Sequence, residues 1–169
     1  MKTLFLIRHA KSSWDDPALD DRWRPLAARG RRDAPRLGRR LARRYRPPDL
    51  LLSSPALRAL DTARLIAARL GCRRVAVDAR LYDGGIRGLQ RVIHQLDDAH
   101  RRVMLFGHNP QLTAMARRYS DAIGHLPTCT ALRLKFDVKS WRRIGPDTPV
   151  SVAVHYARRR RQRAGRNGA

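Results

Sequence analysis

The residues in this chain best suited to chemistry are Arg8 and His9, which directly follow the apolar run from Leu4 to Ile7. Apolar runs of this kind are typical of buried parallel strands. The carboxyl ends of such strands are where open α/β sheets bind ligands. A histidine at that place can act as a nucleophile, and the neighbouring guanidinium can hold an oxyanion such as phosphate.

Two further apolar segments end in residues that could take part in the same chemistry. Residues 50–54 lead into a helix that carries Arg58 near its positively polarised N-terminus. Residues 103–107 lead directly to His108. Taken alone, Arg58 could be a solvated arginine, and His108 could cap the helix that follows it. If the three segments are neighbouring strands, however, all four side chains meet at one edge of a sheet.

The order of the predicted elements indicates an α/β fold that would position these residues. Strands and helices alternate through about the first 120 residues, which predicts a largely parallel sheet with helices on both faces. Segments 131–137 and 150–156 alternate apolar and polar residues and are expected to extend the sheet at an edge. We therefore expect one three-layer α/β/α domain, residues 1–157, with a central, mostly parallel six-stranded sheet. Residues 158–169 are basic and lack an apolar pattern, which predicts a disordered tail.

The segment after the first strand is predicted to be an irregular loop that borders the site. It runs from His9 to about Leu26, is polar, and contains two prolines. A helix should follow, because apolar residues recur at helical spacing from Ala34 onward. Asp33 is a candidate N-cap for this helix, which would place Pro35 in the first turn, where proline is tolerated.

The charge of the chain is far from that of an average protein. The formal net charge is +23 and the pI is about 11.8; only four of the 37 basic residues are lysine, and the rest are arginine. Clustered guanidiniums can neutralise phosphates, so non-specific nucleic-acid binding is one interpretation. The other is a composition bias that puts arginine on every exposed surface. In either case the positive field draws anionic substrates toward the protein.

The remaining composition limits the classes of protein to consider. The chain has two lone cysteines, Cys72 and Cys129, without the spacing of a zinc site or a disulfide framework. No apolar run approaches membrane-spanning length, and the first strand begins within a few residues of the N-terminus. We expect a cytoplasmic monomer with no cofactor and no membrane association.

Three motifs in this order resemble those of the histidine phosphatase superfamily, also called phosphoglycerate-mutase-like. They are Arg8-His9-Ala10, the run Ser-Ser-Pro-x-x-Arg-Ala-x-x-Thr-Ala over residues 53–63, and Gly107-His108-Asn109-Pro110. The short chain, without an inserted cap, is similar to the SixA-type phosphohistidine phosphatases within that superfamily. The resemblance covers roughly residues 1–156.

The resemblance implies a role for each motif residue. His9 would be the nucleophile that becomes phosphorylated, and Arg8, Arg58 and His108 would surround the transferred phosphoryl group. Phosphoryl transfer depends mostly on positioning and on cationic stabilisation of the equatorial oxygens, which two arginines and a histidine can supply without a metal. The implied activity is metal-independent hydrolysis of phosphohistidine on a signalling or phosphotransfer protein.

The chain departs from the resembled pattern in three places. Mutase-branch members use a glutamate after the third strand as a general acid, and the nearest candidate here is Asp83, which could equally be a turn residue before two glycines. Asp15 stands near a position where the mutase branch often has a phosphate-contacting asparagine. Ala27 stands where many relatives have a Thr or Asn helix cap. A site whose general acid contributes little would suit a phosphohistidine substrate, because an imidazole leaving group needs less protonation than an alkoxide does.

Two other functions remain open at this stage. The same site could hydrolyse a small phosphate ester. Alternatively, the chain could be a nucleic-acid-binding module that uses its charge and retains only a vestigial histidine site. Dependence on His9 and on salt concentration separates these functions.

Overall fold

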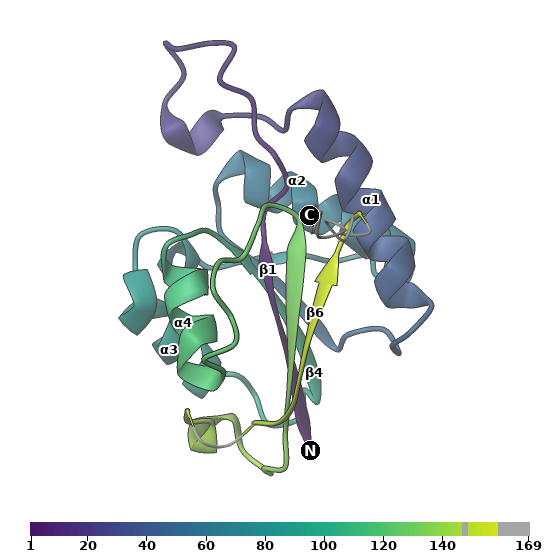
Figure 1. The fold of residues 1–169 in the computed structure, drawn as a ribbon, viewed down its shortest axis with the longest axis vertical. Coiled ribbons are helices and arrows are strands. Elements are labelled where there is room, and N and C mark those ends of the chain that lie inside the picture. The colour runs from purple at the N-terminus through teal and green to yellow at the C-terminus, as the bar shows by residue number, and fades with distance from the viewer. Residues whose placement is uncertain (147–148, 159–169) are drawn as a thin grey trace, which may run out of the picture.

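The structure is a computed structural model that describes residues 1–146 and 149–158. Strands and helices alternate along most of the chain, and short 3-10 turns interrupt the connections (Figure 1). The strands are β1 (Lys2–Arg8), β2 (Leu50–Ser53), β3 (Ala76–Val77), β4 (Arg102–Gly107), β5 (Thr130–Phe136) and β6 (Pro149–Tyr156). The helices are α1 (Ala28–Ala42), α2 (Leu57–Leu70), α3 (Gly85–His94) and α4 (Gln111–Tyr119), and the 3-10 turns are η1 (Asp21–Trp23), η2 (Ala79–Leu81) and η3 (Trp141–Arg143).

The six strands form one sheet in the order β3-β2-β4-β1-β5-β6. The pairs β3/β2, β2/β4 and β4/β1 are parallel, whereas β1/β5 and β5/β6 are antiparallel. The prediction of a central, mostly parallel six-stranded sheet is therefore confirmed, and the two late strands do extend it at one edge.

Helices cover both faces of this sheet, and the sheet separates the apolar core into two layers (Figure 1). Successive residues of β1 point to opposite faces, so Leu4 and Leu6 pack in one layer while Phe5 and Ile7 pack in the other. The first layer contains the apolar faces of α3 and α4, and the second contains those of α1 and α2. This is the three-layer α/β/α arrangement that the alternation of elements predicted.

The first helix begins earlier than its sequence pattern predicted. Asp33 is not its N-cap: α1 starts at Ala28, and Asp33 is buried within the helix, where its carboxylate pairs with Arg29 and Arg36. Pro35 accordingly lies inside the helix. The start is fixed by a tertiary contact, because the amide of Ala27 donates to the Lys11 carbonyl at 2.9 Å.

A glycine in the first turn of α1 allows this contact. A Cβ atom on Gly30 would collide with the Lys11 carbonyl oxygen, so only glycine fits this close approach. The segment that follows His9 is thus held against the first turn of α1.

Within the described residues, no helix is both long enough and apolar enough to span a membrane. The single sheet runs through residues 2–156. The predicted tail, residues 158–169, lies outside the described residues except for Arg158.

Candidate active site

The carboxyl ends of three adjacent parallel strands meet at one edge of the sheet. Arg8 pairs in register with Gly107 on β4, and Ser53 of β2 pairs with Phe106. The amide of His9 continues this ladder by donating to the Gly107 carbonyl at 3.1 Å. The sheet therefore brings the ends of β1, β4 and β2 side by side, as the sequence pattern required.

His9 is buried, with only 9% of its surface exposed, and its tautomer is fixed by one hydrogen bond. Its Nδ1 lies 2.7 Å from the Ala10 carbonyl oxygen. A carbonyl can only accept, so Nδ1 carries the proton and Nε2 carries a lone pair. Burial and the nearby arginines, Arg58 first, lower the pKa of His9 to about 4, although the bond to Ala10 opposes this shift. At neutral pH the ring is uncharged and Nε2 is free to act as a nucleophile.

Thr62 on α2 holds the backbone next to His9. The amide of Ala10 donates to Thr62 Oγ1 at 2.9 Å, and the same hydroxyl donates to the Arg58 carbonyl. Thr62 is fully buried. The Arg-Ala-x-x-Thr spacing thus places Arg58 and Thr62, which supports the backbone beside His9, on successive turns of one helix.

His108 lies beside His9, with the two ring centroids 5.1 Å apart. Its Nε2 is 2.7 Å from Ser54 Oγ, and its Nδ1 has no hydrogen-bond partner within the described residues. Burial, followed by the neighbouring His9 and Arg58, lowers the pKa of His108 to about 3, although Asp21 opposes this shift. The ring of Tyr82 packs edge-on against His108 at 5.5 Å.

Two guanidiniums approach this histidine pair. Arg58 is buried, and its Nη2 lies 2.8 Å from Asp21 Oδ2. Arg8 is half-buried and donates from Nη1 to the Leu126 carbonyl at 2.8 Å, while its buried Nε has no partner within the described residues. Burial lowers the pKa of Arg8 from its usual value.

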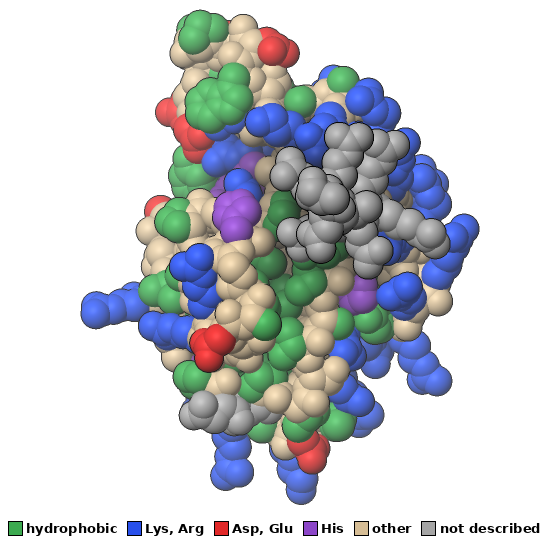
Figure 2. Space-filling model, in the orientation of Figure 1, with side chains coloured by type: hydrophobic (Ala, Val, Ile, Leu, Met, Phe, Trp, Pro, Cys, Tyr) green, Lys and Arg blue, Asp and Glu red, His purple; other side chains and the backbone are tan. Residues whose placement is uncertain are grey.

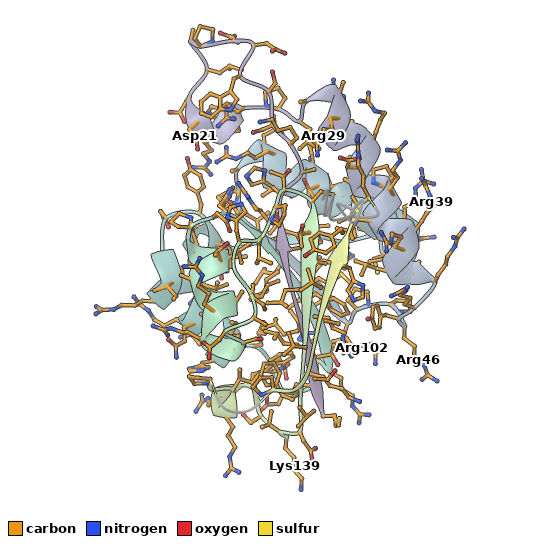
Figure 3. The ribbon with its side chains drawn as sticks, viewed as in Figure 1. Asp21, Arg29, Arg39, Arg46, Arg102 and Lys139 are labelled. Atoms are coloured by element: carbon orange, nitrogen blue, oxygen red, sulfur yellow. The ribbon has the colours of Figure 1, made fainter. Side chains whose placement is uncertain are left out.

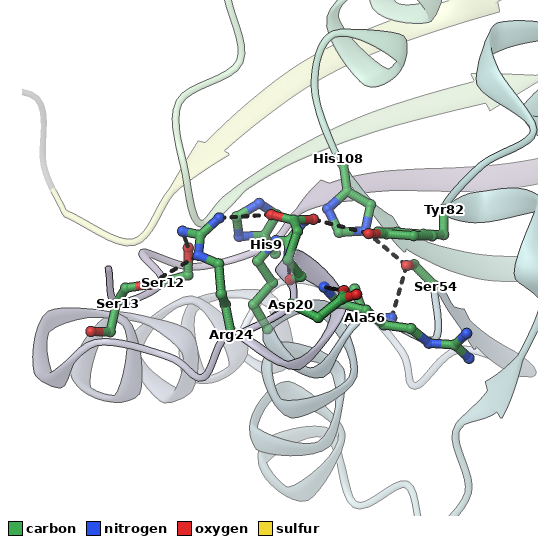
Figure 4. A network of polar contacts seen from close by, with 12 residues as sticks. His9, Ser12, Ser13, Asp20, Arg24, Ser54, Ala56, Tyr82 and His108 are labelled. Atoms are coloured by element: carbon green, nitrogen blue, oxygen red, sulfur yellow. Dashed lines mark hydrogen bonds and ion pairs between the residues drawn. The ribbon is translucent and has the colours of Figure 1, made fainter. Parts of the chain in front are cut away.

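Asp21 joins the loop after His9 to the rest of the site. Figure 4 shows two of its partners, Arg24 and Tyr82, near the two histidines. Besides Arg58, it accepts hydrogen bonds from Arg24 at 2.9 Å and from the Tyr82 hydroxyl at 3.0 Å. Burial alone would raise the pKa of this carboxyl, but the hydrogen bonds from Arg58, Arg24 and Tyr82 lower it to about 2. Asp21 is therefore ionised at neutral pH.

Arg24 fixes the shape of the loop. It is buried, and its guanidinium donates to Ser12 Oγ at 2.7 Å and to the Ser13 carbonyl at 3.1 Å. Its planar group also stacks on the ring of Trp14, 3.2 Å from the ring centroid. The loop is thus pre-organised in spite of its irregular backbone.

The two other carboxylates singled out in the sequence lie apart from this network. Asp83 is exposed, and within the described residues its side chain makes no hydrogen bond or ion pair. Asp15 is exposed on the loop after His9, where its backbone amide donates to Ser13 Oγ. The role of Asp83 as a general acid stays a prediction.

No motif in the sequence marks Asp21, Arg24 or Tyr82 as site residues. Four aspartates crowd the loop at positions 15, 16, 20 and 21, and no local pattern distinguishes the one that reaches Arg58. Ser54 and Thr62, in contrast, belong to the motif of residues 53–63, so a helical projection of that motif could have placed Thr62 next to Arg58.

This geometry defines a site for phosphoryl transfer. An uncharged histidine with a free Nε2, two guanidiniums and a second histidine meet at the ends of parallel strands, a place suited to anions. The chain belongs to the histidine phosphatase superfamily, branch 1, whose family model matches residues 4–127. Membership supports phosphatase activity.

The chain is also similar to individual proteins. It is 32% identical over 150 residues to an uncharacterised chloroplastic protein of Arabidopsis thaliana, a match that covers 83% of this chain and 69% of the relative. A structure assigned as the phosphohistidine phosphatase SixA from Agrobacterium tumefaciens superposes with a TM-score of 0.73 at 26% identity, covering 79% of this chain and 90% of the other. A SixA protein histidine phosphatase complexed with tungstate has the same fold, with a TM-score of 0.72 at 20% identity, covering 80% and 88%.

Proposed function

We propose that this protein is a metal-independent phosphatase that removes phosphate from phosphohistidine on a signalling or phosphotransfer protein. The observation that carries this proposal is the hydrogen bond from His9 Nδ1 to the Ala10 carbonyl, which leaves Nε2 with a lone pair among Arg8, Arg58 and His108. The similarity to SixA structures supports the same class of substrate.

In the first half of the reaction, His9 Nε2 attacks the phosphorus of the substrate. A bond forms between Nε2 and phosphorus while the phosphorus–nitrogen bond of the substrate breaks, and the electron pair leaves with the substrate imidazole. Arg8, Arg58 and His108 stabilise the charge on the equatorial oxygens. Nε of Arg8 and Nδ1 of His108 are buried beside this site and have no hydrogen-bond partner within the described residues.

The state of the carboxylates favours an imidazole leaving group. Asp21 is the carboxylate in contact with Arg58, and with a pKa of about 2 it carries no proton to donate at neutral pH. An alkoxide leaving group depends on a proton donor, which typically contributes ~10²–10⁴-fold. An imidazole protonated on its distal nitrogen leaves as a neutral molecule, so it has less need of an acid.

In the second half, water attacks the phosphohistidine formed on His9. The nitrogen–phosphorus bond breaks with its electron pair returning to Nε2, both protons of the water leave with the inorganic phosphate as H2PO4⁻, and His9 returns to its uncharged form. Covalent catalysis of this kind divides one difficult hydrolysis into two easier steps.

The surface around the site supports a macromolecular substrate. Asp21 is 48% exposed at its side chain, and the same loop presents Trp14 and Trp23 to solvent with 69% and 56% of their surfaces exposed. Exposed aromatic side chains of this size are characteristic of protein interaction surfaces.

The test compares phosphate release from a histidine-phosphorylated protein and from a simple aryl phosphate, with wild type and with His9→Ala. We expect wild type to prefer the phosphohistidine substrate and His9→Ala to lose activity on both. His94→Ala is a matched control, because His94 hydrogen-bonds the Ile144 carbonyl instead of residues of the site. A preference for the aryl phosphate would favour a small ester as substrate. No turnover of either substrate would refute the proposed activity.

A further inference from the structure

The strongest positive surface outside the active site is a stripe of arginines on α1 and the turn that follows it. Five arginines recur at positions i, i+3, i+4, i+7 and i+8, which is the spacing of one helix face, and the last two lie just past the end of α1. They are Arg36, Arg39, Arg40, Arg43 and Arg44. Together with Ala157, just past the end of β6, they line a hollow of about 460 Å³. We refer to this surface as the arginine groove.

Few negative charges balance the groove. Among the described residues, none that lines the groove is acidic, and the nearest ion-pair partner, Asp33, is shared by Arg29, Arg36 and Arg158. Within the described residues, the side chains of Arg39, Arg43 and Arg44 make no hydrogen bond or ion pair. Figure 3 shows Arg39 projecting outward from α1, and Figure 2 shows basic side chains gathered on the same side of the molecule.

This arrangement carries a local cost in stability. Arg36 and Arg40 are four residues apart within α1, and like charges at this spacing repel each other and destabilise a helix. The negative end of the α1 dipole offsets part of this repulsion. A bound polyanion would offset the rest, which distinguishes the groove from arginines scattered singly over the surface.

We propose that the arginine groove binds the phosphate backbone of double-stranded nucleic acid without reading its sequence. The stripe extends from Arg36 to Arg44, and these eight residue steps correspond to about 12 Å along a helix. A duplex carries one negative charge per ~1.7 Å of its axis when both strands are counted, so this length of duplex contains about seven phosphate charges. The five guanidiniums are therefore comparable in number to the phosphates in this length of duplex. Arg36 pairs with Asp33 and Arg40 donates to the Tyr156 carbonyl. The other three, which have no partner within the described residues, can each bind phosphate oxygens in a bidentate manner.

The side chains of the groove favour a duplex over a single strand. Single-strand sites combine basic residues with aromatic rings on which the bases stack. The groove is lined by guanidiniums and one alanine, with no aromatic ring among its lining residues. The neighbouring Tyr45 is half-buried, and its hydroxyl is paired with His155 at 2.8 Å. The groove can therefore contact only the phosphate backbone of a nucleic acid, and such contacts carry no information about base sequence.

The groove is independent of the catalytic site. None of its lining residues contacts His9, Arg58 or His108, and no residue of the catalytic network lines the groove. Binding of a duplex to α1 is thus compatible with phosphatase activity and does not depend on the proposed substrate.

The test measures the affinity of the full chain for a fluorescent 20-base-pair DNA of random sequence, from 50 to 200 mM salt. Five phosphate contacts predict a slope of log K against log salt of about −4.5, or roughly a 500-fold loss of affinity over this range. The variant R39Q/R43Q/R44Q removes three groove arginines that have no described partner. Its slope should be smaller in magnitude by about 2.7.

The matched control is R73Q/R87Q/R91Q, which lowers the net charge by the same amount at exposed arginines outside the groove, two of them on α3 across the sheet. We expect it to keep the wild-type slope. Equal losses in the two triple variants would show that net charge alone drives binding and would overturn the proposal. Tighter binding of a single-stranded 20-mer than of the duplex would also overturn it, as would no binding at 50 mM salt. Thermal melting and aryl phosphatase activity of R39Q/R43Q/R44Q should remain at least at the wild-type level.

Discussion

The carboxylate of Asp21 is paired with the guanidinium of Arg58, with Oδ2 and Nη2 2.8 Å apart. Arg58 is one of the arginines that the family resemblance assigns to the phosphoryl group, so a negative group of the chain itself occupies one of its hydrogen-bonding edges. Tyr82 and Arg24 hold Asp21 in this place. A phosphoryl group that binds Arg58 must share this arginine with the carboxylate or displace it.

Asp21→Asn is expected to tighten the binding of inorganic phosphate, because it removes the charge that competes for Arg58. A half-exposed ion pair contributes up to ~1 kcal/mol, so the inhibition constant for phosphate should fall by up to about fivefold. Competitive inhibition of aryl phosphate hydrolysis measures this constant. Weaker inhibition in the variant would mean that Asp21 orients Arg58 for phosphate instead of competing with it.

Thr62→Val should lower both stability and turnover. The substitution keeps the shape of the side chain but leaves the buried amide of Ala10 without its acceptor, which costs about 1–3 kcal/mol of unfolding free energy. The Ala10 carbonyl, which fixes the His9 tautomer, belongs to the same residue, so kcat should fall as well. Urea denaturation and steady-state kinetics measure the two effects.

A second threonine provides the control for this experiment. Thr130 Oγ1 is buried and has no hydrogen-bond partner within the described residues. Thr130→Val therefore removes an unsatisfied polar atom and should leave stability unchanged or increase it. If both variants lost equal stability, the Thr62 hydrogen bond would not be the cause.

The stability of the protein should decrease as the pH falls from about 6.5 toward 4. The folded-state pKa values of His9 and His108 are about 4 and 3, below the usual value of 6.5, so the unfolded chain binds more protons in this range. Each histidine contributes a slope of ~1.4 kcal/mol per pH unit in this window, and the stabilisation is complete above pH 6.5. His9→Gln should remove one such contribution. Urea denaturation of both proteins between pH 4.5 and 7 measures the slopes, and equal slopes would contradict the assignment.

The value of kcat/KM measured at neutral pH should also be retained at acidic pH values where an ordinary histidine is protonated. The profile of kcat/KM reports the pKa of the free enzyme's nucleophile, so its acid limb should lie near pH 4. A limb near pH 6.5 would mean that the ring of His9 is not held uncharged by burial. The pH series uses a substrate whose own ionisation has been measured separately.

The sequence-based role of Asp83 as a general acid leads to a distinct prediction. Asp83→Asn should then slow hydrolysis of an alkyl phosphate by ~10²–10⁴-fold while leaving phosphohistidine hydrolysis nearly unchanged. Rates on both substrates measured side by side separate the two effects. An unchanged alkyl phosphatase rate would exclude Asp83 from proton transfer, in keeping with its exposed position.

The sequence by itself determined the fold class and the residues at the strand ends. Apolar runs followed by Arg8-His9 and by His108 identified two buried strands and the chemistry at their ends. This was possible because the apolar character and the spacing of residues can be read from short stretches of the sequence. The later alternating segments predicted edge strands for the same reason, and β5 and β6 occupy that place.

Tertiary structure alone decided the parts of the site that depend on the path of irregular backbone. Periodicity shows which face of α1 is buried, but its start at Ala28 comes from the contact of Ala27 and Gly30 with Lys11. Likewise, Asp21 reaches Arg58 because Arg24 ties the loop to Ser12 and Ser13. These contacts join residues distant in sequence through single hydrogen bonds, which leave no repeating pattern in the chain.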